Sequence, residues 1–373
     1  MPYVDVRYVV SGFSRTDAKA FSRTPISRRR LLQSIPALLM APRVFGQTGS
    51  APLRVTGINH VTLSVSDVKR SVDFYQGLFG MPVASRQGVT TNLRIGAGPQ
   101  LLGIGAVGSN PPRINHLCLG VEGFDVNRIT AALAARGITK SDSPGAAGGG
   151  SADGPMKMRV RTRGPDAGGD RAGTPELYFT DPDGIVVQLQ DPRYCGGGGP
   201  LGIACAPPEP PSRKGLLALR GWSHCTNSVS DAARSNAFYQ ELFGLRIQAH
   251  QGPGAPVLGV GGVEFLMFGG GGGRGGANAA PRPAGINHLC MNMDGFKPDE
   301  VIAALERYGI KPRPAGQTTG PLMHYISMRM ENRGGAKEGT PELYFSDPDG
   351  LLIQLQDVKY CGGAGVLGDV CAG

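Results

Sequence analysis

Four of the six histidines in this 373-residue sequence occupy the same position in four similar segments. The segments are Gly57-Ile58-Asn59-His60, Arg113-Ile114-Asn115-His116, Gly221-Trp222-Ser223-His224 and Gly285-Ile286-Asn287-His288. Each segment opens a run of alternating residues that is typical of a strand, in which His60 and Thr62 share one face, opposite Asn59 and Val61. A lone histidine is usually structural, but neutral imidazole is also the commonest side-chain metal ligand. We therefore predict that these four histidines bind metal.

A third ligand is expected on the strand that follows each Asp-Pro-Asp-Gly turn. Gln188 in the first copy and Gln354 in the second lie opposite apolar neighbours. If this strand pairs with the two histidine strands, the first site contains His60, His116 and Gln188. The second site then contains His224, His288 and Gln354. The alternative is that both glutamines only hydrogen-bond a substrate or each other.

These candidate ligands belong to a chain that is duplicated end to end and doubled again within each copy. The segment Gly-Thr-Pro-Glu-Leu-Tyr-Phe begins at Gly173 and recurs at Gly339. Asp67 is placed to cap a helix that reaches Phe79 and ends at Gly80; further helices are expected over 125–136 and 298–308. The sequence therefore predicts an α+β fold of four βαβββ modules paired into two domains.

The predicted domains span 54–195 and 215–361. A Gly/Pro-rich linker over 196–214 joins them, and a Gly-rich tail over 362–373 contains Cys371. Glycine-rich stretches at 145–150, 196–199 and 269–276 fall between the predicted elements and are expected to be surface loops.

The positive charge of the chain is concentrated at its beginning. Residues 1–46 hold eight basic and two acidic residues, which is +6 of the formal net charge of +9, so nucleic-acid binding is not expected. Arg28-Arg29-Arg30 followed by a short apolar run over 35–41 is typical of a twin-arginine export signal. We expect the chain to use that export machinery and to be periplasmic or extracellular in a bacterium, without a stable membrane anchor. The alternative is a disordered basic tail.

The seven cysteines agree with export. Cys195 and Cys205 have counterparts in Cys361 and Cys371, and each pair closes a loop of glycine and small residues. Such pairs are typical of disulfides in an oxidising compartment, although free thiols are the alternative. The other cysteines, which lie inside predicted strands, are expected to be small core residues: Cys118, Cys225 and Cys290.

On these residues the chain resembles the vicinal oxygen chelate superfamily, which includes glyoxalase I, bleomycin-resistance proteins and extradiol dioxygenases. The resemblance covers Thr56 to Cys361 and implies a divalent metal, iron(II) first, with manganese, zinc or nickel as alternatives. The usual last ligand of the family is glutamate, where this chain has Gln188 and Gln354. Where a further ligand exists, the resemblance places it at Leu102 and Leu266, or at Glu264 if the alignment shifts.

The segment Leu343-Tyr344-Phe345-Ser346-Asp347-Pro348-Asp349-Gly350 is similar to the extradiol signature around its active-site tyrosine. The resemblance implies catalytic roles for Tyr344 and its counterpart Tyr178. The catalytic histidine of that signature is missing, since the corresponding windows contain Gly335-Ala336-Lys337 and Gly169-Asp170-Arg171.

A neutral glutamine in place of glutamate leaves a divalent site one charge more positive, which favours an anionic substrate or one that ionises on binding. Arg159 and Arg329, expected at equivalent places, are the predicted groups for holding it. The resemblance implies a dioxygenase-like oxidoreductase acting on a small molecule with vicinal oxygens. The alternatives are a lyase or isomerase, or a binding or resistance protein without turnover.

Overall fold

The computed structural model describes residues 51–141, 154–270 and 283–372. The predicted export signal over 1–46, the stretch over 145–150 and most of the stretch over 269–276 lie outside these ranges. None of the described helices combines the length and apolar character needed to span a membrane. All described residues belong to one compact unit, Ser50–Gly373.

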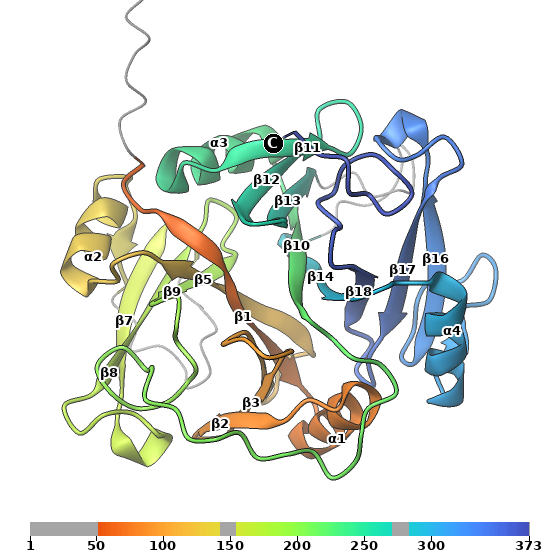
Figure 1. Ribbon diagram of the computed structural model, residues 1–373. Coiled ribbons are helices and arrows are strands. Elements are labelled where there is room, and N and C mark those ends of the chain that lie inside the picture. Colours follow the sequence, from red (N-terminus) through yellow and green to blue (C-terminus); the bar gives the residue numbers. More distant parts are fainter. Residues whose placement is uncertain (1–50, 142–153, 271–282, 373) are drawn as a thin grey trace, which may run out of the picture. The chain divides into compact units, whose positions relative to one another are not determined.

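The first half of that unit forms a nine-stranded mixed sheet with the strand order β2-β3-β4-β1-β5-β9-β8-β7-β6 (Figure 1). Its elements are β1 (Val55–Val65), α1 (Val68–Phe79), β2 (Val83–Gln87), β3 (Thr90–Arg94), β4 (Leu101–Ala106), β5 (Arg113–Val121), α2 (Val126–Ala134), β6 (Thr139–Lys140), β7 (Lys157–Arg163), η1 (Pro165–Ala167), β8 (Thr174–Thr180) and β9 (Val186–Gln190). The first strands of two successive modules, β1 and β5, pair antiparallel at the centre of the sheet.

The second half repeats this order in a sheet of its own, β11-β12-β13-β10-β14-β18-β17-β16-β15. Its elements are β10 (Gly221–Val229), α3 (Ala232–Phe243), β11 (Arg246–His250), β12 (Pro256–Gly261), β13 (Glu264–Gly270), β14 (Gly285–Met293), α4 (Pro298–Arg307), β15 (Lys311–Pro312), β16 (Met323–Arg329), η2 (Glu331–Arg333), β17 (Thr340–Ser346) and β18 (Leu352–Asp357). The predicted α+β fold of four βαβββ modules paired two by two is confirmed.

The helix ends follow the predicted caps. The Asp67 side chain accepts a hydrogen bond from the backbone N–H of Arg70, and α1 ends at Gly80 with a left-handed φ of 65°. The helix α2 ends two residues earlier than predicted, at Ala134. One face of each helix packs on the apolar face of its sheet, so the opposite face of each sheet is left for the polar residues.

Each Asp-Pro-Asp-Gly turn contacts the helix of the other half. Asp181 accepts a hydrogen bond from the Tyr239 hydroxyl at 3.2 Å, and Asp183 accepts one from the Ser230 hydroxyl at 2.5 Å. The reciprocal contacts are Tyr75 to Asp347 at 3.1 Å and Ser66 to Asp349 at 2.5 Å. These turns lead directly into β9 and β18, so each half fixes the start of the strand that carries the glutamine of the other.

The buried turn aspartates predict a pH-dependent stability. Burial raises the pKa of both Asp181 and Asp347 to about 6. Because the folded-state pKa lies above the unfolded value, the folded chain binds more protons between the two values, and stability falls as pH rises from about 4 to about 6. We expect Asp181→Asn to remove about 3 kcal/mol of this pH dependence, measured by urea unfolding across that range.

A matched control is Asp183→Asn in the same turn. Burial raises the pKa of Asp183, but hydrogen bonds from Ser230 and Arg234 outweigh burial and lower it. This variant should therefore change the pH dependence with the opposite sign, mainly below about pH 4. An unchanged pH profile in Asp181→Asn would contradict the assignment.

Candidate metal centre

The three residues predicted for the first site come together on three adjacent strands. The β-ladder places both His60 and Gln188 next to Cys118, and His116 lies opposite Thr62, two residues after His60. The strands β1, β5 and β9 therefore each supply one candidate ligand. The ring centroids of His60 and His116 are 5.5 Å apart, and His60 Nε2 lies 3.0 Å from Gln188 Oε1. All three side chains are buried.

A β-bulge precedes each histidine and changes the face on which its neighbour lies. The ladder passes from Ile58 to His60 without a partner for Asn59, and in β5 it omits Asn115 in the same way. The expectation that Asn59 points away from His60 is therefore wrong, because a bulged residue leaves the strand alternation. Asn59 Oδ1 instead lies 2.8 Å from His60 Nδ1, and Asn115 Oδ1 lies 2.8 Å from His116 Nδ1.

These asparagines fix the tautomer of both imidazoles. The Asn59 amide nitrogen donates to the backbone oxygen of Tyr194 at 2.9 Å, and the Asn115 amide nitrogen donates to the Ser64 hydroxyl at 2.9 Å. Each Oδ1 must therefore accept the proton of Nδ1, which leaves Nε2 with a lone pair. A neutral imidazole with an outer hydrogen bond at Nδ1 is the usual form of a metal ligand.

The lone pairs of the first site converge in a way that suits a cation. His60 Nε2 and Gln188 Oε1 are both acceptors at 3.0 Å, which is the separation of two ligands at right angles on an ion with bonds of about 2.1 Å. His116 Nε2 is buried and makes no hydrogen bond of good geometry, although Gln188 lies close enough to favour protonation of the ring. Without an ion, Gln188 must turn its amide to donate to His60. The residues fit a divalent metal.

Burial also keeps the histidines in the ligand form. It lowers the pKa of His60 to about 4, and it lowers the pKa of His116 well below the ordinary value, with the neighbouring His60 as a second cause. Both rings are therefore neutral at pH 7.

The second set has the same layout with one substitution. Thr226 lies opposite His288, and Cys290 lies opposite Gln354. The two imidazole centroids are again 5.5 Å apart, and Asn287 Oδ1 lies 2.9 Å from His288 Nδ1. The residue before His224 is Ser223, whose hydroxyl lies 3.1 Å from His224 Nδ1.

The further ligand suggested by the resemblance is not present on the described strands. Leu102 and Leu266 are fully buried in the hydrophobic core. Glu264 accepts hydrogen bonds from Ile58 N and Gln100 Nε2, both at 2.6 Å, and so joins the two halves of the chain. Within the described ranges no three histidine, cysteine, aspartate or glutamate side chains form a metal-binding group. Each candidate site therefore depends on its glutamine.

The two tyrosines lie against the candidate ligands. Tyr178 is opposite Gln188 in the ladder and packs edge-on against His116 with centroids 5.5 Å apart. Tyr344 packs in the same way against His288 at 5.3 Å, and its hydroxyl donates to Glu342 at 3.4 Å. Burial raises the pKa of Tyr178 well above its ordinary value, so its phenol keeps its proton at neutral pH.

The expected equivalence of Arg159 and Arg329 is wrong. Arg159 lies opposite Tyr178, and its guanidinium is 5.4 Å from the Tyr178 ring, whereas Arg329 lies opposite Thr340. The counterpart of Arg329 is Arg163, and both are completely buried in ion pairs. Arg329 donates to Glu342 at 2.9 Å, so its charge is neutralised inside the protein.

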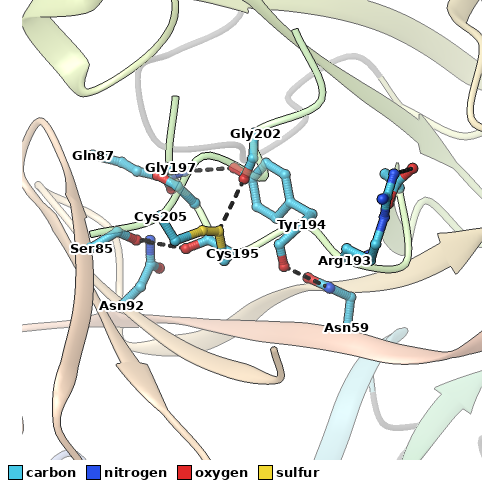
Figure 2. Close-up of a disulfide and its surroundings, with 12 residues drawn as sticks. Asn59, Ser85, Gln87, Asn92, Arg193, Tyr194, Cys195, Gly197, Gly202 and Cys205 are labelled. Atoms are coloured by element: carbon cyan, nitrogen blue, oxygen red, sulfur yellow. Dashed lines mark hydrogen bonds and ion pairs between the residues drawn. A yellow bond between two sulfur atoms is a disulfide. The ribbon is translucent and has the colours of Figure 1, made fainter. Parts of the chain in front are cut away.

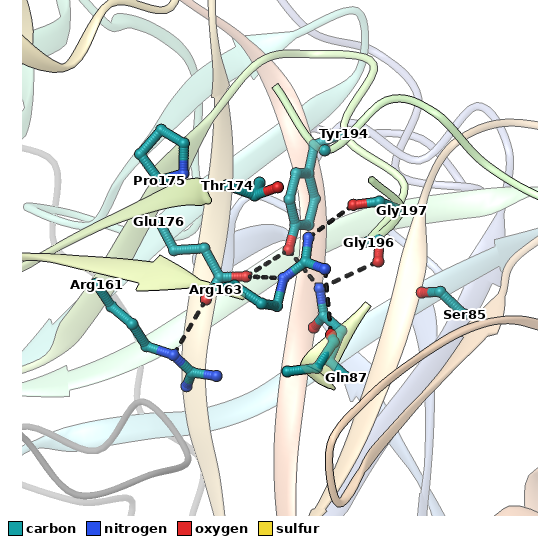
Figure 3. A network of polar contacts seen from close by, with 12 residues as sticks. Ser85, Gln87, Arg161, Arg163, Thr174, Pro175, Glu176, Tyr194, Gly196 and Gly197 are labelled. Atoms are coloured by element: carbon teal, nitrogen blue, oxygen red, sulfur yellow. Dashed lines mark hydrogen bonds and ion pairs between the residues drawn. The ribbon is translucent and has the colours of Figure 1, made fainter. Parts of the chain in front are cut away.

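A buried network that the sequence-based predictions did not include lies against His60, and Figure 3 shows its polar contacts. Arg163 Nε donates to Glu176 Oε1 at 2.8 Å, and the Tyr194 hydroxyl donates to the same oxygen at 2.9 Å. The Tyr194 ring stacks on His60 with centroids 5.6 Å apart and an interplanar angle of 29°. The signal in the sequence was the repeated Glu of Gly-Thr-Pro-Glu and the repeated Tyr-Cys-Gly-Gly.

Both predicted cysteine pairs are at disulfide distance. The Cα atoms are 6.2 Å apart for Cys195–Cys205 and 6.3 Å apart for Cys361–Cys371. Cys195 directly follows Tyr194, and its backbone oxygen accepts a hydrogen bond from the Ser85 hydroxyl at 3.1 Å (Figure 2). The disulfide loop is thus held against the network under His60.

The three remaining cysteines are buried and outside disulfides, as expected. Cys225 belongs to the hydrophobic core, whereas Cys118 and Cys290 lie next to the candidate glutamines in the ladder. Burial raises the pKa of Cys118 and Cys290, so both are thiols rather than thiolate ligands.

The second site opens into a cavity of about 610 Å³. His224, His288 and Gln354 lie on its wall together with Tyr344 and Tyr325. This volume is in the range of small-molecule sites, and the candidate ligands are therefore accessible to a substrate.

The buried ion pair predicts a large cost for removing one partner. Glu176→Ala leaves the Arg163 charge without compensation in a site that is completely buried, so we expect the free energy of unfolding to fall by about 3–5 kcal/mol. The matched control is Glu209→Ala, because Glu209 forms an exposed ion pair with Arg86 and its loss should change the free energy of unfolding far less. Equal losses in urea unfolding would contradict this interpretation.

The comparisons with known proteins agree with this fold. Residues 57–189 match the model of the Glyoxalase/Bleomycin resistance protein/Dioxygenase superfamily. The sequence matches no curated protein.

Solved structures extend the similarity over both halves. A catechol 2,3-dioxygenase is 18% identical with a TM-score of 0.52, over 84% of this chain and 88% of the other. A homoprotocatechuate 2,3-dioxygenase from Brevibacterium fuscum, in complex with 3,4-dihydroxyphenylacetate, is 16% identical with a TM-score of 0.54, over 83% and 82%. A Mn(II)-bound glyoxalase from Novosphingobium aromaticivorans is 15% identical with a TM-score of 0.51, over 81% and 82%. These likenesses show a shared fold, and residues 57–189 resemble the domains of the glyoxalase and dioxygenase superfamily.

Proposed function

We propose that this chain is an exported, divalent-metal-dependent enzyme of the vicinal oxygen chelate type that acts on a small substrate with vicinal oxygens. Its layout is most like that of the extradiol dioxygenases. The observation that carries the proposal is the convergence of two neutral imidazoles and one amide oxygen, with each Nδ1 hydrogen-bonded to the preceding side chain. Twin-arginine transport to the periplasm or beyond is supported by the arginine-rich start and the two cysteine pairs.

In the second half, His224, His288 and Gln354 would hold the ion. A divalent cation there would polarise or deprotonate the vicinal oxygens of a bound substrate. Tyr344 lies beside His288 in the cavity, and its phenol, which donates to Glu342 in this structure, would turn its proton to a substrate oxygen as negative charge develops. Iron(II) is the first choice of metal, with manganese, zinc or nickel as alternatives.

A second candidate function is Lewis-acid chemistry of the lyase or isomerase type. Among the described residues that line the cavity, the only histidines are the two candidate ligands, and the only carboxylate is Glu342, which pairs with Arg329. The segments 169–171 and 335–337, where the resemblance would place the extradiol histidine, do not line the cavity either. The missing extradiol histidine favours this alternative, and because the described lining offers no separate base, proton transfer in either chemistry would fall to Tyr344 or to water.

The metal content of the full chain, purified without chelators, tests the proposal. We expect about two equivalents of a divalent metal, falling to about one in His224→Ala/His288→Ala, because the two three-ligand sites are independent. His250→Ala is the matched control, since His250 lies outside both sets, and it should retain about two equivalents. A chain that contains no metal and takes up none on titration would overturn the proposal.

Oxygen consumption distinguishes the two chemistries. With the metal-loaded chain and a catechol, uptake of oxygen together with a ring-opened product supports the dioxygenase. Turnover of a substrate with vicinal oxygens without oxygen uptake supports the lyase or isomerase.

A further inference from the structure

We propose that Ser223 makes the second candidate metal site bind its ion more weakly than the first. The inference rests on the proposed function, because it takes His224, His288 and Gln354 as the ligands of that site. It concerns the residue directly before each candidate histidine, which is asparagine in three of the four modules and serine only here. Ser223 is thus a positioning residue that leaves the proton of His224 unfixed.

An asparagine at this place allows only one tautomer of its histidine. Asn59 Oδ1 lies 2.8 Å from His60 Nδ1. The Asn59 amide nitrogen donates to the carbonyls of Tyr194 at 2.9 Å and Pro192 at 3.3 Å, and these contacts fix which end of the amide faces the imidazole (Figure 2). Because an amide oxygen only accepts, Nδ1 must carry the proton and Nε2 keeps its lone pair. The first site is therefore in the tautomer that binds an ion before the ion arrives.

A serine at the same place allows both tautomers. Ser223 is completely buried, and its hydroxyl lies 3.1 Å from His224 Nδ1 and also contacts the Cys290 thiol. A hydroxyl both donates and accepts. It can accept the Nδ1 proton, as an asparagine does, and turn its own proton to the sulfur. It can equally donate to Nδ1, and the imidazole proton then lies on Nε2, where an ion would bind.

Gln354 favours the second of these tautomers while no ion is bound. Its amide nitrogen has no hydrogen-bond partner among the described residues, whereas its side chain does hydrogen-bond to the His224 ring. The Gln354 oxygen is therefore the atom that meets this ring, and it can pair with a proton on Nε2. Hydrogen bonds from Ser223 to Nδ1 and from Nε2 to Gln354 would then satisfy both ring nitrogens. The apparent affinity for an ion falls with the fraction of His224 that is in the binding tautomer.

The packing around the two histidines also differs at one place. Phe265 stacks on His224 with centroids 4.3 Å apart, whereas Leu101 takes that place beside His60 in the ladder. A stacked ring restricts the plane of the imidazole but does not select which nitrogen carries the proton. The difference that reaches the proton is the serine.

The second half has the backbone that an asparagine at this position needs. The ladder omits Ser223 in a bulge, as it omits Asn59 in the first half. Tyr360 takes the place of Tyr194, with its ring centroid 5.7 Å from that of His224. The amide introduced by Ser223→Asn can therefore donate to the Tyr360 carbonyl and present its oxygen to Nδ1.

The first measurement is the tautomer of each histidine, read from the ring nitrogens by NMR of the metal-free full-length chain with isotope-labelled histidine. His60 should carry its proton on Nδ1, and His224 should carry it largely on Nε2. Ser223→Asn should move the His224 proton to Nδ1, and Asn59→Ser should let the His60 proton occupy both nitrogens. A His224 proton that lies on Nδ1 in the wild type overturns the inference.

The second measurement is the affinity of each site for zinc(II), by competition with a chelating dye. The second site is measured alone in His60→Ala/His116→Ala, and the first site is measured alone in His224→Ala/His288→Ala. We expect the second site to bind zinc about tenfold more weakly, which is the effect of losing an outer hydrogen-bond partner of a ligand histidine.

Exchange of the two outer residues tests the cause. Ser223→Asn should strengthen the second site by about tenfold, and Asn59→Ser should weaken the first site by the same factor. The matched control is Ser71→Ala, because Ser71 is a completely buried serine on α1 outside both ligand sets, and it should change neither affinity. If Ser223→Asn does not fold, Asn59→Ser decides, since it only shortens a side chain.

The outcomes separate this inference from the proposed function. Two sites that bind zinc equally, or a folded Ser223→Asn with unchanged second-site affinity, keep the proposed function and overturn the role of Ser223. A chain that shows the expected tautomers but binds no zinc at either site overturns the metalloenzyme, and with it the weaker site, while the tautomer assignment stands.

Discussion

Hydrogen bonding between the first strands of successive modules, β1 with β5 and β10 with β14, is the constraint on which both candidate sites depend. The face opposite the histidines is apolar, and Val61, Leu63 and Leu117 are completely buried. A slip of one residue would exchange this face with the histidine face and bury imidazoles in the core. Burial of the apolar face therefore sets the register, and the register brings the two histidines and the glutamine together.

The β-bulges add a local constraint to the register of the paired strands. A regular strand would send Asn59 to the face opposite His60, but the bulge brings the two side chains together. The same device recurs at Asn115 and Asn287, so the residue that fixes each tautomer precedes its histidine directly in the chain. Two of these asparagines are themselves oriented by distant partners, Asn59 by the backbone of the Tyr194 segment and Asn115 by the Ser64 hydroxyl.

The sequence predicted the features that depend on local periodicity and repetition. The four modules, the helix caps and the grouping of histidines with glutamines all follow from alternation and from matching segments. The arginines did not follow, because Arg159, Arg161 and Arg163 alternate along one strand and only the pairing with β8 shows which one meets Tyr178. The partners of Glu264 lie in the other half of the chain, and no local pattern indicates them.

The two halves share the contacts that hold the glutamine strands in place, but they differ in the side chains around their candidate sites. Each Asp-Pro-Asp-Gly turn is held by the other half, and each buried arginine pairs with the glutamate of the following strand. These contacts maintain the strands that carry Gln188 and Gln354, so a change in them would disturb the ligand set. The side chains outside this framework, Arg159 in one half and Tyr325 with Arg313 in the other, can change without loss of the core. A duplicated framework of this kind allows one site to be altered for a new ligand while the shared supports hold both in place.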